Sequence, residues 1–312
     1  MKSLNKETRQ QIIDLKKKGY SSRWIANHVG CGKSTVNDVY NAYLSASNSP
    51  VRGTSPKILF LDVETTADIV ATFGRRNVNI SESNVIQQGN ELISVALSWL
   101  DSDNVVSYSA RFNGFSINED LERDMLDVIR SCIESADAVV IHNARFDLGT
   151  IQQRMLHYGM GRLPSVKVID TLQIARKYLQ LRSNKLDSIT KYFGLSNKVE
   201  NEGIGLWIKV QAGCEQALQR MVQYNEGDVI ALKDVYRKFV SLNLGVNTAI
   251  FSDHEGHVCT SCGSHSVSKT GQLVHTSVSS FEEFECNDCG AKMRGRVNVL
   301  PKEKRKNLLV PI

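Results

Sequence analysis

The acidic side chains of Asp62 and Glu64 follow directly on a run of four apolar residues at positions 58–61. Such a run predicts a strand that is buried on both faces. Side chains alternate between the faces of a strand with period two, so both carboxylates point to the same side. Two like charges held this close are costly unless a cation lies between them, and a divalent cation is the obvious candidate. The alternative is a strand that runs into a polar loop, where the paired acids merely face water.

A second polar cluster follows the buried strand that we predict at residues 138–141. Asn143, Phe146 and Asp147 lie where this strand passes into a helix. Asp170 stands at a similar junction, after a short apolar run, but its position immediately before a predicted helix is typical of an N-cap. We therefore treat Asp147 as the candidate for chemistry and Asp170 as a capping residue.

The third polar group is the pair Tyr224 and Asp228, inside a segment at residues 215–240 whose apolar residues recur with helical spacing. Residues four apart project from the same face of a helix. Taken alone, a Tyr–Asp pair at this spacing is usually a hydrogen-bonded surface pair. Its order along the chain, after the other two clusters, is what indicates a functional site.

The elements that must position these side chains predict a mixed sheet. Strands are expected at residues 92–99 and 104–109, joined by a hairpin-type turn, and a helix follows at residues 119–134. The strand at 138–141 then opens a strand–helix alternation. Antiparallel strands followed by such alternation describe an α/β fold, a ribonuclease-H-like mixed sheet flanked by helices.

The ordered set of motifs resembles the DEDD superfamily of 3′→5′ exonucleases, in the tyrosine-containing branch that includes polymerase proofreading domains. The resemblance covers about residues 57–242 and is strongest to a phage-type branch related to the exonuclease domain of family B polymerases. The stretches that carry it are Phe60-Leu61-Asp62-Val63-Glu64-Thr65, Ser183-Asn184-Lys185-Leu186-Asp187 and Trp207. One departure is that two residues separate Asn143 from Phe146, where family B polymerases usually have three. This favours a stand-alone nuclease over a detached polymerase fragment.

The resemblance implies a two-metal enzyme that hydrolyses phosphodiester bonds of nucleic acid from the 3′ end. The expected substrate is DNA rather than RNA, and the expected setting is phage or bacterial replication, recombination or repair. The ligands it implies for two Mg²⁺ or Mn²⁺ ions are Asp62, Glu64, Asp147 and Asp228. Asp62 would bridge both ions, and Tyr224 would orient the attacking water. The substrate contacts it implies in this domain are Asn143, Phe146 and Lys185. A replicative polymerase, or another replication or recombination protein, is an expected partner.

Residues 1–44 predict a small, all-α DNA-binding domain. Helices are expected at residues 7–18, at residues 24–29 and from Ser34 onward. With the Gly30-Cys31-Gly32 turn between the last two, the arrangement resembles the helix-turn-helix of resolvases and transposases. The third helix would enter the major groove with Lys33, Ser34 and Thr35 near the DNA. The alternative is a helical bundle that binds protein.

The C-terminal region, residues 250–300, predicts a small zinc ribbon. Its two Cys-x-x-Cys knuckles are formed by Cys259 with Cys262 and by Cys286 with Cys289. Each knuckle is followed by a glycine, which permits a tight turn around a metal, and four thiolates suit structural Zn²⁺. Two disulfides are the alternative, which a reducing cytoplasm disfavours. The Ser-, Pro- and Gly-rich residues 45–56 predict a flexible linker that leaves the N-terminal domain mobile, and residues 301–312 a basic tail.

Composition argues against a membrane or secreted protein. The 312 residues are 41% hydrophobic and 23% charged, and they contain no apolar run of about 18 residues and no signal-peptide pattern at the N-terminus. Residues 1–53 carry nine Lys/Arg against three Asp/Glu, whereas residues 54–250 carry 21 against 23. Basic ends around a slightly acidic centre indicate that the ends bind a polyanion and that the centre binds a cation. We expect a nucleic acid partner, no membrane, and a cytoplasmic location.

Three other functions fit parts of the sequence. One is a DNA-binding regulator whose nuclease-like domain is inert, against which the intact acidic set argues. Another is a transposase or integrase, since these enzymes also join a helix-turn-helix, a ribonuclease-H fold and zinc modules, but they use a different acidic set and have no need of Tyr224 beside Asp228. The third is a structure-selective endonuclease with the same catalytic residues.

Overall fold

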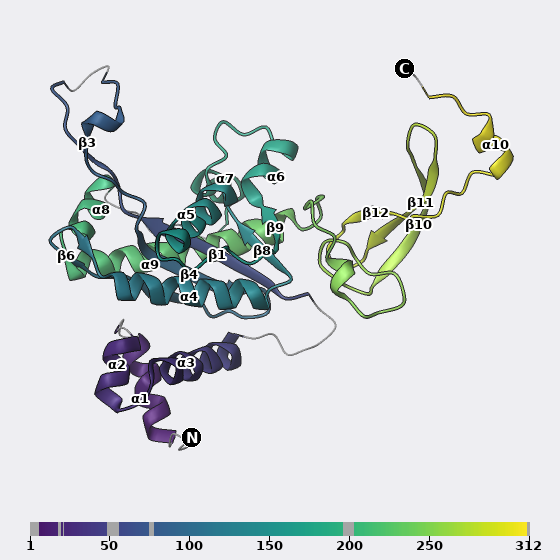
Figure 1. Ribbon diagram of the computed structural model, residues 1–312. Helices are drawn as coiled ribbons and strands as arrows, with labels where there is room; N and C mark the ends of the chain where they lie inside the picture. Colours follow the sequence, from purple (N-terminus) through teal and green to yellow (C-terminus); the bar gives the residue numbers. More distant parts are fainter. Residues whose placement is uncertain are drawn as a thin grey trace.

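The computed structural model describes residues 6–17, 20, 22–48, 56–74, 78–195 and 203–310. Three groups of elements follow one another along the chain: a set of N-terminal helices, a central sheet covered by helices, and a C-terminal three-stranded sheet (Figure 1). The central part is the mixed sheet flanked by helices that the sequence predicts. None of the described helices combines the length and apolar composition that a bilayer crossing needs.

The central sheet has five strands in the order β5-β4-β1-β8-β9. Their bounds are β1 Ile58–Thr65, β4 Leu92–Trp99, β5 Val106–Ser109, β8 Ala138–Ile141 and β9 Lys167–Asp170. Strand β1 is antiparallel to β4 and parallel to β8, so it joins an antiparallel half of the sheet to a parallel half. The strand that carries the first acidic pair is therefore the middle strand.

Strand β1 shows why the acids take one side of the sheet. Leu59 and Leu61 pack into the core on one face, and Ile58 and Phe60 pack into the core on the other. All four are at most 1% exposed, which confirms the predicted strand buried on both faces. Because the alternation has period two, the next even-numbered side chains, Asp62 and Glu64, belong to the face of Phe60.

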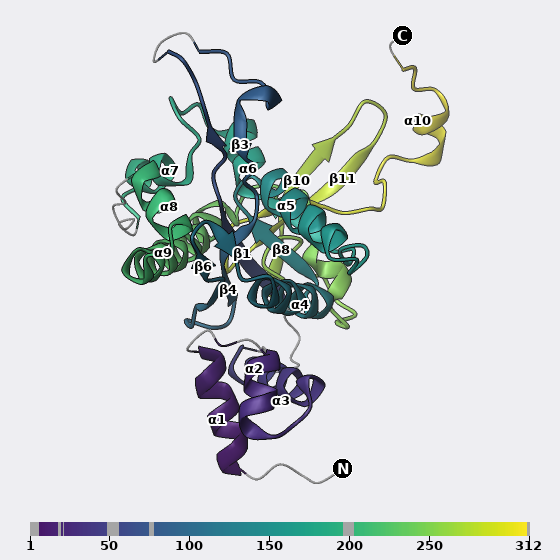
Figure 2. The same ribbon diagram turned by 60° about the vertical axis from the view of Figure 1, so that its left-hand side comes forward.

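Helices cover both faces of the sheet. The first face packs against α4 (Glu119–Ser135) and α5 (Ala144–His157), and the second against α6 (Thr171–Tyr178), α7 (Leu186–Phe193) and α9 (Glu215–Phe239). Figure 2 shows α4 and α5 on one side of the strands and α7 and α9 on the other. Helix α4 buries Leu121, Met125 and Ile129 at spacings of four, and Asn118 caps it by accepting a hydrogen bond from the Leu121 backbone N–H.

The N-terminal helices are α1 (Lys6–Lys17), α2 (Ser22–Val29) and α3 (Lys33–Asn48), packed around a core of their own that includes Ile12, Ile25 and Val36. Helix α3 extends into the segment that the sequence predicts as a linker, because its Ser, Ala and Asn residues are compatible with a helix; residues 49–55 lie outside the described part of the chain. The described parts of these helices lie against the central part, since α2 packs on α4 and Tyr40 of α3 meets Tyr108 of β5.

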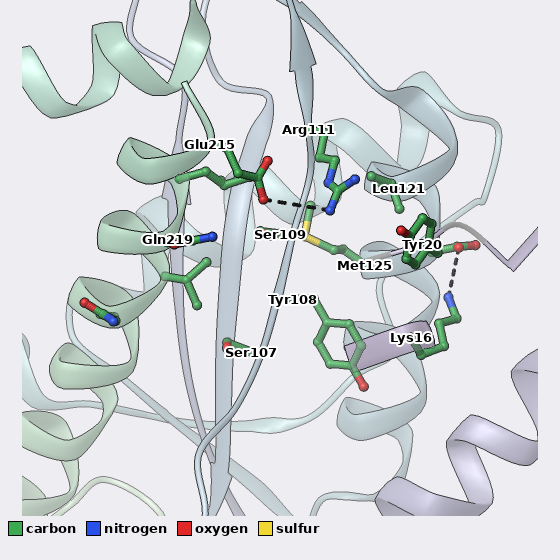
Figure 3. A pocket seen from close by; sticks show the side chains of 14 residues that line it. Lys16, Tyr20, Ser107, Tyr108, Ser109, Arg111, Leu121, Met125, Glu215 and Gln219 are labelled. Carbon is green, nitrogen blue, oxygen red and sulfur yellow. Dashed lines mark hydrogen bonds and ion pairs between the residues drawn. The ribbon is translucent and has the colours of Figure 1, made fainter. Parts of the chain in front are cut away.

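The contact between the N-terminal helices and the central part is polar as well as apolar. Tyr40 meets Tyr108 edge to face, with ring centroids 5.6 Å apart. Beside this pair, Lys16 Nζ lies 2.9 Å from Asp124 Oδ2. A cavity of about 610 Å³ remains next to these contacts and is lined by residues of both parts, among them Lys16 and Arg111 (Figure 3). The interface between the N-terminal helices and the central part therefore borders a cavity.

Smaller elements complete the chain, and several were not foreseen. Within the segment 67–90, expected to be irregular, β2 and β3 form a two-stranded arm. The remaining elements are β2 Ile69–Val70, η1 Glu82–Asn84, β3 Val85–Gln87, β6 Phe112–Asn113, β7 Ser116–Ile117, α8 Ile204–Gln211, η2 Thr248–Phe251, β10 Val267–His275, β11 Ser280–Cys286, β12 Lys292–Arg294 and α10 Lys302–Lys306. Strands β10 to β12 make the ribbon-like C-terminal sheet, in which β11 pairs antiparallel with both β10 and β12.

Candidate metal-binding active site

Three of the four predicted carboxylates come together where α9 passes over the end of β1. Asp62, Glu64 and Asp228 each place a carboxylate oxygen within 4.8 Å of the other two. Asp62 and Glu64 share the face of β1 that packs against α9, and Asp228 lies in the middle of that helix and is 6% exposed. The two acids of the strand and the acid of the helix therefore meet in one place.

The fourth carboxylate, Asp147, lies beside this group rather than in it. Its Oδ1 accepts a hydrogen bond from the backbone N–H of Val63, at 3.2 Å, and Val63 is the residue between Asp62 and Glu64. Asp147 is 3% exposed, and burial raises the pKa of its carboxyl to about 7. The first turn of α5 therefore brings a carboxyl group to β1, in surroundings that disfavour its ionised form.

The donor set of this site fits a hard divalent cation. All the candidate ligands are carboxylates, and Mg²⁺ and Mn²⁺ prefer oxygen ligands. Three acids whose oxygens lie within 4.8 Å of one another repel strongly unless positive charge is placed among them. A cation would also favour the ionised form of Asp147.

Tyr224 lies one helical turn before Asp228 on α9, as the spacing of four requires. Its side chain is 8% exposed and packs edge to face against Trp207 of α8, with ring centroids 5.9 Å apart. Trp207 therefore packs on the phenol ring one helical turn from Asp228. Both aromatic residues belong to the motifs of the sequence analysis, but their contact was not predicted.

Asp170 shapes the loop that carries Asn143. As predicted, it caps α6, since its Oδ1 accepts hydrogen bonds from the backbone N–H groups of Leu172 and Gln173. The same carboxylate also accepts from the backbone of Asn143 and Ala144, each at 3.1 Å. Asn143 has a left-handed backbone with φ of 75°, which is uncommon for a residue with a side chain. Asp170 thus stabilises the turn from β8 into α5.

One cavity adjoins the acidic group, and a second cavity shares Asn143 with it. One, of about 430 Å³, is lined by Asp62, Asp228, Asn143 and Lys185, so the predicted contact Lys185 faces the site. The other, of about 460 Å³, is lined by Asn143 and by Phe146, whose ring is 45% exposed. Of the predicted substrate residues of the central part, Lys185 therefore lies in the cavity next to the carboxylates, Phe146 lies in the second cavity, and Asn143 lines both.

The first cavity also contains residues that the sequence interpretation missed. His142, Arg176 and Asn184 line it together with Lys185. The His142 ring lies 2.9 Å from Thr171 Oγ1 and 3.0 Å from the Asn184 carbonyl, and so links β8 to α6 and to the loop before α7. His142 could have been found, since it directly follows a buried strand as Asn143 does. Arg176 carries no such signal, because one basic residue on an exposed helix face is ordinary.

The remaining predicted substrate contacts, Lys33, Ser34 and Thr35, form the first turn of α3 among the N-terminal helices. They line neither of the two cavities at the acidic group. Lys33 Nζ instead lies 3.9 Å from Asp124 Oδ1 on α4. Any role of these residues is therefore separate from the carboxylate site.

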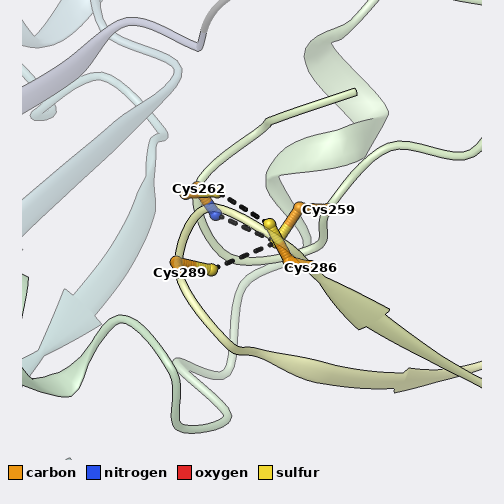
Figure 4. Close-up of side chains that lie close together, drawn as sticks. All are labelled: Cys259, Cys262, Cys286 and Cys289. Atoms are coloured by element: carbon orange, nitrogen blue, oxygen red, sulfur yellow. Dashed lines mark hydrogen bonds between the residues drawn. The ribbon is translucent and has the colours of Figure 1, made fainter. Parts of the chain in front are cut away.

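The predicted zinc cysteines form a second cluster, shown in Figure 4. All four sulfur atoms lie within 4.8 Å of one another, and the distances are 3.6 Å for Cys259–Cys289 and 3.6 Å for Cys262–Cys286. A disulfide needs about 2.05 Å, whereas four sulfurs around a tetrahedral Zn²⁺ lie about 3.8 Å apart. Hydrogen bonding from the Cys262 side chain lowers the pKa of Cys259 to about 5, which favours a thiolate. The arrangement fits a metal ion held by four thiolates and not two disulfides.

The knuckle glycines behave as the sequence predicts. Gly263 and Gly290 have φ of 76° and 70°, in the left-handed region that favours glycine. After each turn, a backbone N–H is directed back to the knuckle, from Gly263 to the Cys259 carbonyl and from Gly290 to the Cys286 carbonyl. The turn geometry therefore gathers the sulfur atoms.

A comparison with protein families agrees with the fold of the central part. A family model described as the RNase_H superfamily matches residues 81–240, a range that contains Asp147, Tyr224 and Asp228. No curated protein matches the chain. Among solved structures, the family B DNA polymerase from the hyperthermophilic archaeon Pyrobaculum calidifontis is similar, with 15% sequence identity and a TM-score of 0.44 over 62% of this chain. The similarity spans only 26% of that polymerase.

Proposed function

The chain belongs to the RNase_H superfamily, and from this we propose that it is a metal-dependent 3′→5′ exonuclease of the tyrosine-containing DEDD type that acts on DNA. The observation that carries the proposal is the meeting of Asp62, Glu64 and Asp228, whose carboxylate oxygens lie within 4.8 Å of one another. Tyr224 one turn before Asp228 supports this branch of the superfamily.

In this mechanism the carboxylates bind the metal ions and Tyr224 orients the attacking water. Asp62, Glu64 and Asp228 would hold two Mg²⁺ or Mn²⁺ ions, and Asp147 would complete the ligand set from the first turn of α5. When bound, such a pair of ions supplies Lewis acidity to both the attacking water and the departing 3′-oxygen. Tyr224 orients the water by hydrogen bonding; a free phenol with a pKa near 10 is a poor base, so its part is positional.

The surface around the carboxylates binds the substrate. Lys185 and Arg176 line the cavity that contains Asp62, and their positive charges suit phosphate groups of the bound strand. Phe146, with its ring 45% exposed in the adjoining cavity, offers a stacking surface for an unpaired base. Asn143, common to both cavities, contacts the terminal nucleotide between them.

The flanking parts serve the same substrate. We assign residues 1–44 to a helix-turn-helix that binds DNA, residues 57–243 to the exonuclease domain and residues 250–300 to a ribbon held by one Zn²⁺ at its four cysteines. Residues 292–306 carry seven Lys/Arg against Glu303 alone, which supports contact with a phosphate backbone. A replication or recombination protein, such as a polymerase, would supply the 3′ ends.

The test is digestion of 3′- and 5′-end-labelled single- and double-stranded DNA and RNA with Mg²⁺, Mn²⁺ or a chelator. A 3′→5′ exonuclease shortens a 5′-labelled strand stepwise and releases the 3′ label as a mononucleotide; an endonuclease gives discrete internal products. Asp62→Ala and Asp228→Ala should abolish cleavage and leave DNA binding intact. The matched control is Asp234→Ala, on the same helix but ion-paired with Arg237. Full activity in both site variants would refute the assignment.

A further inference from the structure

Asn225 connects the acidic group to the neighbouring strand through two hydrogen bonds. Its Nδ2 donates to Asp62 Oδ2 at 2.6 Å, and its Oδ1 accepts from Ser94 Oγ at 3.0 Å. Asn225 and Ser94 are both 0% exposed. Ser94 lies on β4 directly opposite Glu64 in the antiparallel register. A chain of hydrogen bonds thus runs from β4 through α9 to the acid on β1.

Simple donor and acceptor rules fix the direction of this chain. An ionised carboxylate only accepts hydrogen bonds, so the amide group of Asn225 must turn its NH₂ toward Asp62. Its carbonyl oxygen then faces Ser94, whose hydroxyl must donate to it. With both ends engaged, the amide cannot flip without leaving a buried polar atom unsatisfied. The side chain is therefore held in one orientation.

We propose that Asn225 is a positioning residue for the metal site: it holds the plane of the Asp62 carboxylate in the orientation in which it faces Glu64 and Asp228. The proposal rests on the proposed metal-dependent function of that site. Its geometric basis is that the Asn225 Nδ2–Asp62 Oδ2 bond is short and charge-assisted, while Ser94 prevents Asn225 itself from turning. Ser94 acts on Asp62 only through Asn225.

A purely structural role makes a different prediction. A buried asparagine whose bonds merely stabilise the packing of α9 on the sheet would affect the free energy of unfolding and leave the affinity for a cation unchanged. A positioning residue changes cation affinity, because an Asp62 side chain without its partner must be ordered when the cation binds. Loss of such outer partners typically weakens metal binding about 10- to 100-fold. Cation affinity therefore separates the two roles.

The experiment is calorimetric titration of the zinc-loaded full chain with Mn²⁺, for the wild type, Asn225→Ala, Ser94→Ala and the double variant. We expect Asn225→Ala to weaken Mn²⁺ binding about 10- to 100-fold and Ser94→Ala to weaken it less. The double variant should bind no more weakly than Asn225→Ala alone, because Ser94 acts through Asn225. The matched control is Ser98→Ala, which removes a buried hydroxyl of the same strand that accepts a hydrogen bond from Lys233 of α9 at 3.1 Å. It should bind Mn²⁺ like the wild type.

The outcomes are distinguishable. Wild-type Mn²⁺ affinity in Asn225→Ala, an equal loss in Ser98→Ala, or losses that multiply in the double variant would each overturn the positioning role. If Asn225→Ala does not fold, the Mn²⁺ affinity of Ser94→Ala decides. Wild-type affinity in that variant refutes the positioning of Asp62 by Ser94 and Asn225. A wild type that binds Mn²⁺ but cleaves no nucleic acid refutes the proposed function and leaves the Asn225 test in force. A wild type that binds no Mn²⁺ refutes both.

Discussion

The backbone N–H of Val63 donates a hydrogen bond to Oδ1 of Asp147, at 3.2 Å. Val63 separates Asp62 from Glu64, so this bond ties the first turn of α5 to the strand that carries both acids. Burial raises the pKa of the Asp147 carboxyl to about 7. The folded protein thus keeps an acid in a place where ionising it is costly unless a cation is bound.

We expect Asp147→Asn to stabilise the protein in the absence of divalent cations. Between the ordinary Asp pKa of about 3.9 and the folded value of about 7, the folded state binds a proton that the unfolded state does not. Wild-type stability therefore falls as the pH rises through this window. Asparagine keeps the acceptor for Val63 and has no charge, so its advantage should grow by about 2 kcal/mol from pH 5 to pH 8. Urea unfolding at both pH values, without Mg²⁺ or Mn²⁺, measures it.

The same substitution should abolish Mg²⁺-dependent cleavage, so that a more stable protein is a less active one. Asp234→Asn, on the surface of α9, serves as the control and should change neither the pH dependence nor the activity. An Asp147→Asn variant whose stability follows that of the wild type at both pH values would mean that Asp147 is already ionised in the cation-free protein.

Tyr224→Phe should slow cleavage about 10- to 100-fold and leave KM nearly unchanged, because the phenol hydroxyl is lost while the ring packing against Trp207 remains. Single-turnover kinetics on a labelled oligonucleotide measures the effect. Tyr236→Phe is the matched control: Tyr236 is on the same helix and buried, but its ring packs against Phe60, away from the acids. Equal rates for both variants would leave Tyr224 without a part in catalysis.

Cys286→Ser should remove about one Zn²⁺ per chain, because a structural site with three thiolates and no replacement ligand binds zinc much more weakly. Metal analysis of the purified chain measures this. The C-terminal sheet should lose its order, since Cys259, Cys286 and Ala291 form most of its small buried core. Cys214→Ser, at the start of α9, changes a cysteine outside the cluster and should leave the zinc content as it is. Unchanged zinc in Cys286→Ser would contradict the four-cysteine site.

Sequence reasoning succeeded where the information is local. The apolar run before Asp62 predicted both the strand and the face of the acids, because side-chain alternation depends only on neighbouring residues. The spacing of Tyr224 and Asp228 predicted their common helix face for the same reason. The N-cap role of Asp170 followed from its residue type and position, although its second role, holding the turn at Asn143, did not.

The rest depends on contacts between distant parts of the chain. Asn225 is 163 positions from Asp62, and nothing in the polar pattern of α9 distinguishes it from a surface residue. Short elements such as β2 and β3 contain too few residues for a periodic signal. The N-terminal contact was missed because Asp120 and Asp124, four apart on α4, look like an ordinary solvated face.

That contact is centred on Asp124. Its Oδ2 accepts hydrogen bonds from Lys16 Nζ at 2.9 Å and from the Ser22 backbone N–H at 2.7 Å, and its Oδ1 lies 3.9 Å from Lys33 Nζ. Lys16 and Asp124 are 7% and 6% exposed, and burial lowers the pKa of Lys16 although Asp124 acts against this. Breaking a buried pair by removing one partner typically costs about 3–5 kcal/mol. Separation of the two parts would let Lys16 return to water.

We therefore expect Asp124→Ala to release the N-terminal helices from α4. Small-angle scattering should show a larger radius of gyration, and proteases should cut faster between the two parts. Since Lys33 is a proposed DNA contact, release should also raise the affinity of the chain for duplex DNA several-fold, an increase that high salt would diminish. Glu119→Ala, on the same helix and paired with Arg123 at 3.6 Å, is the matched control and should behave like the wild type. A compact Asp124→Ala chain with wild-type affinity for DNA would show that Asp124 does not hold the two parts together.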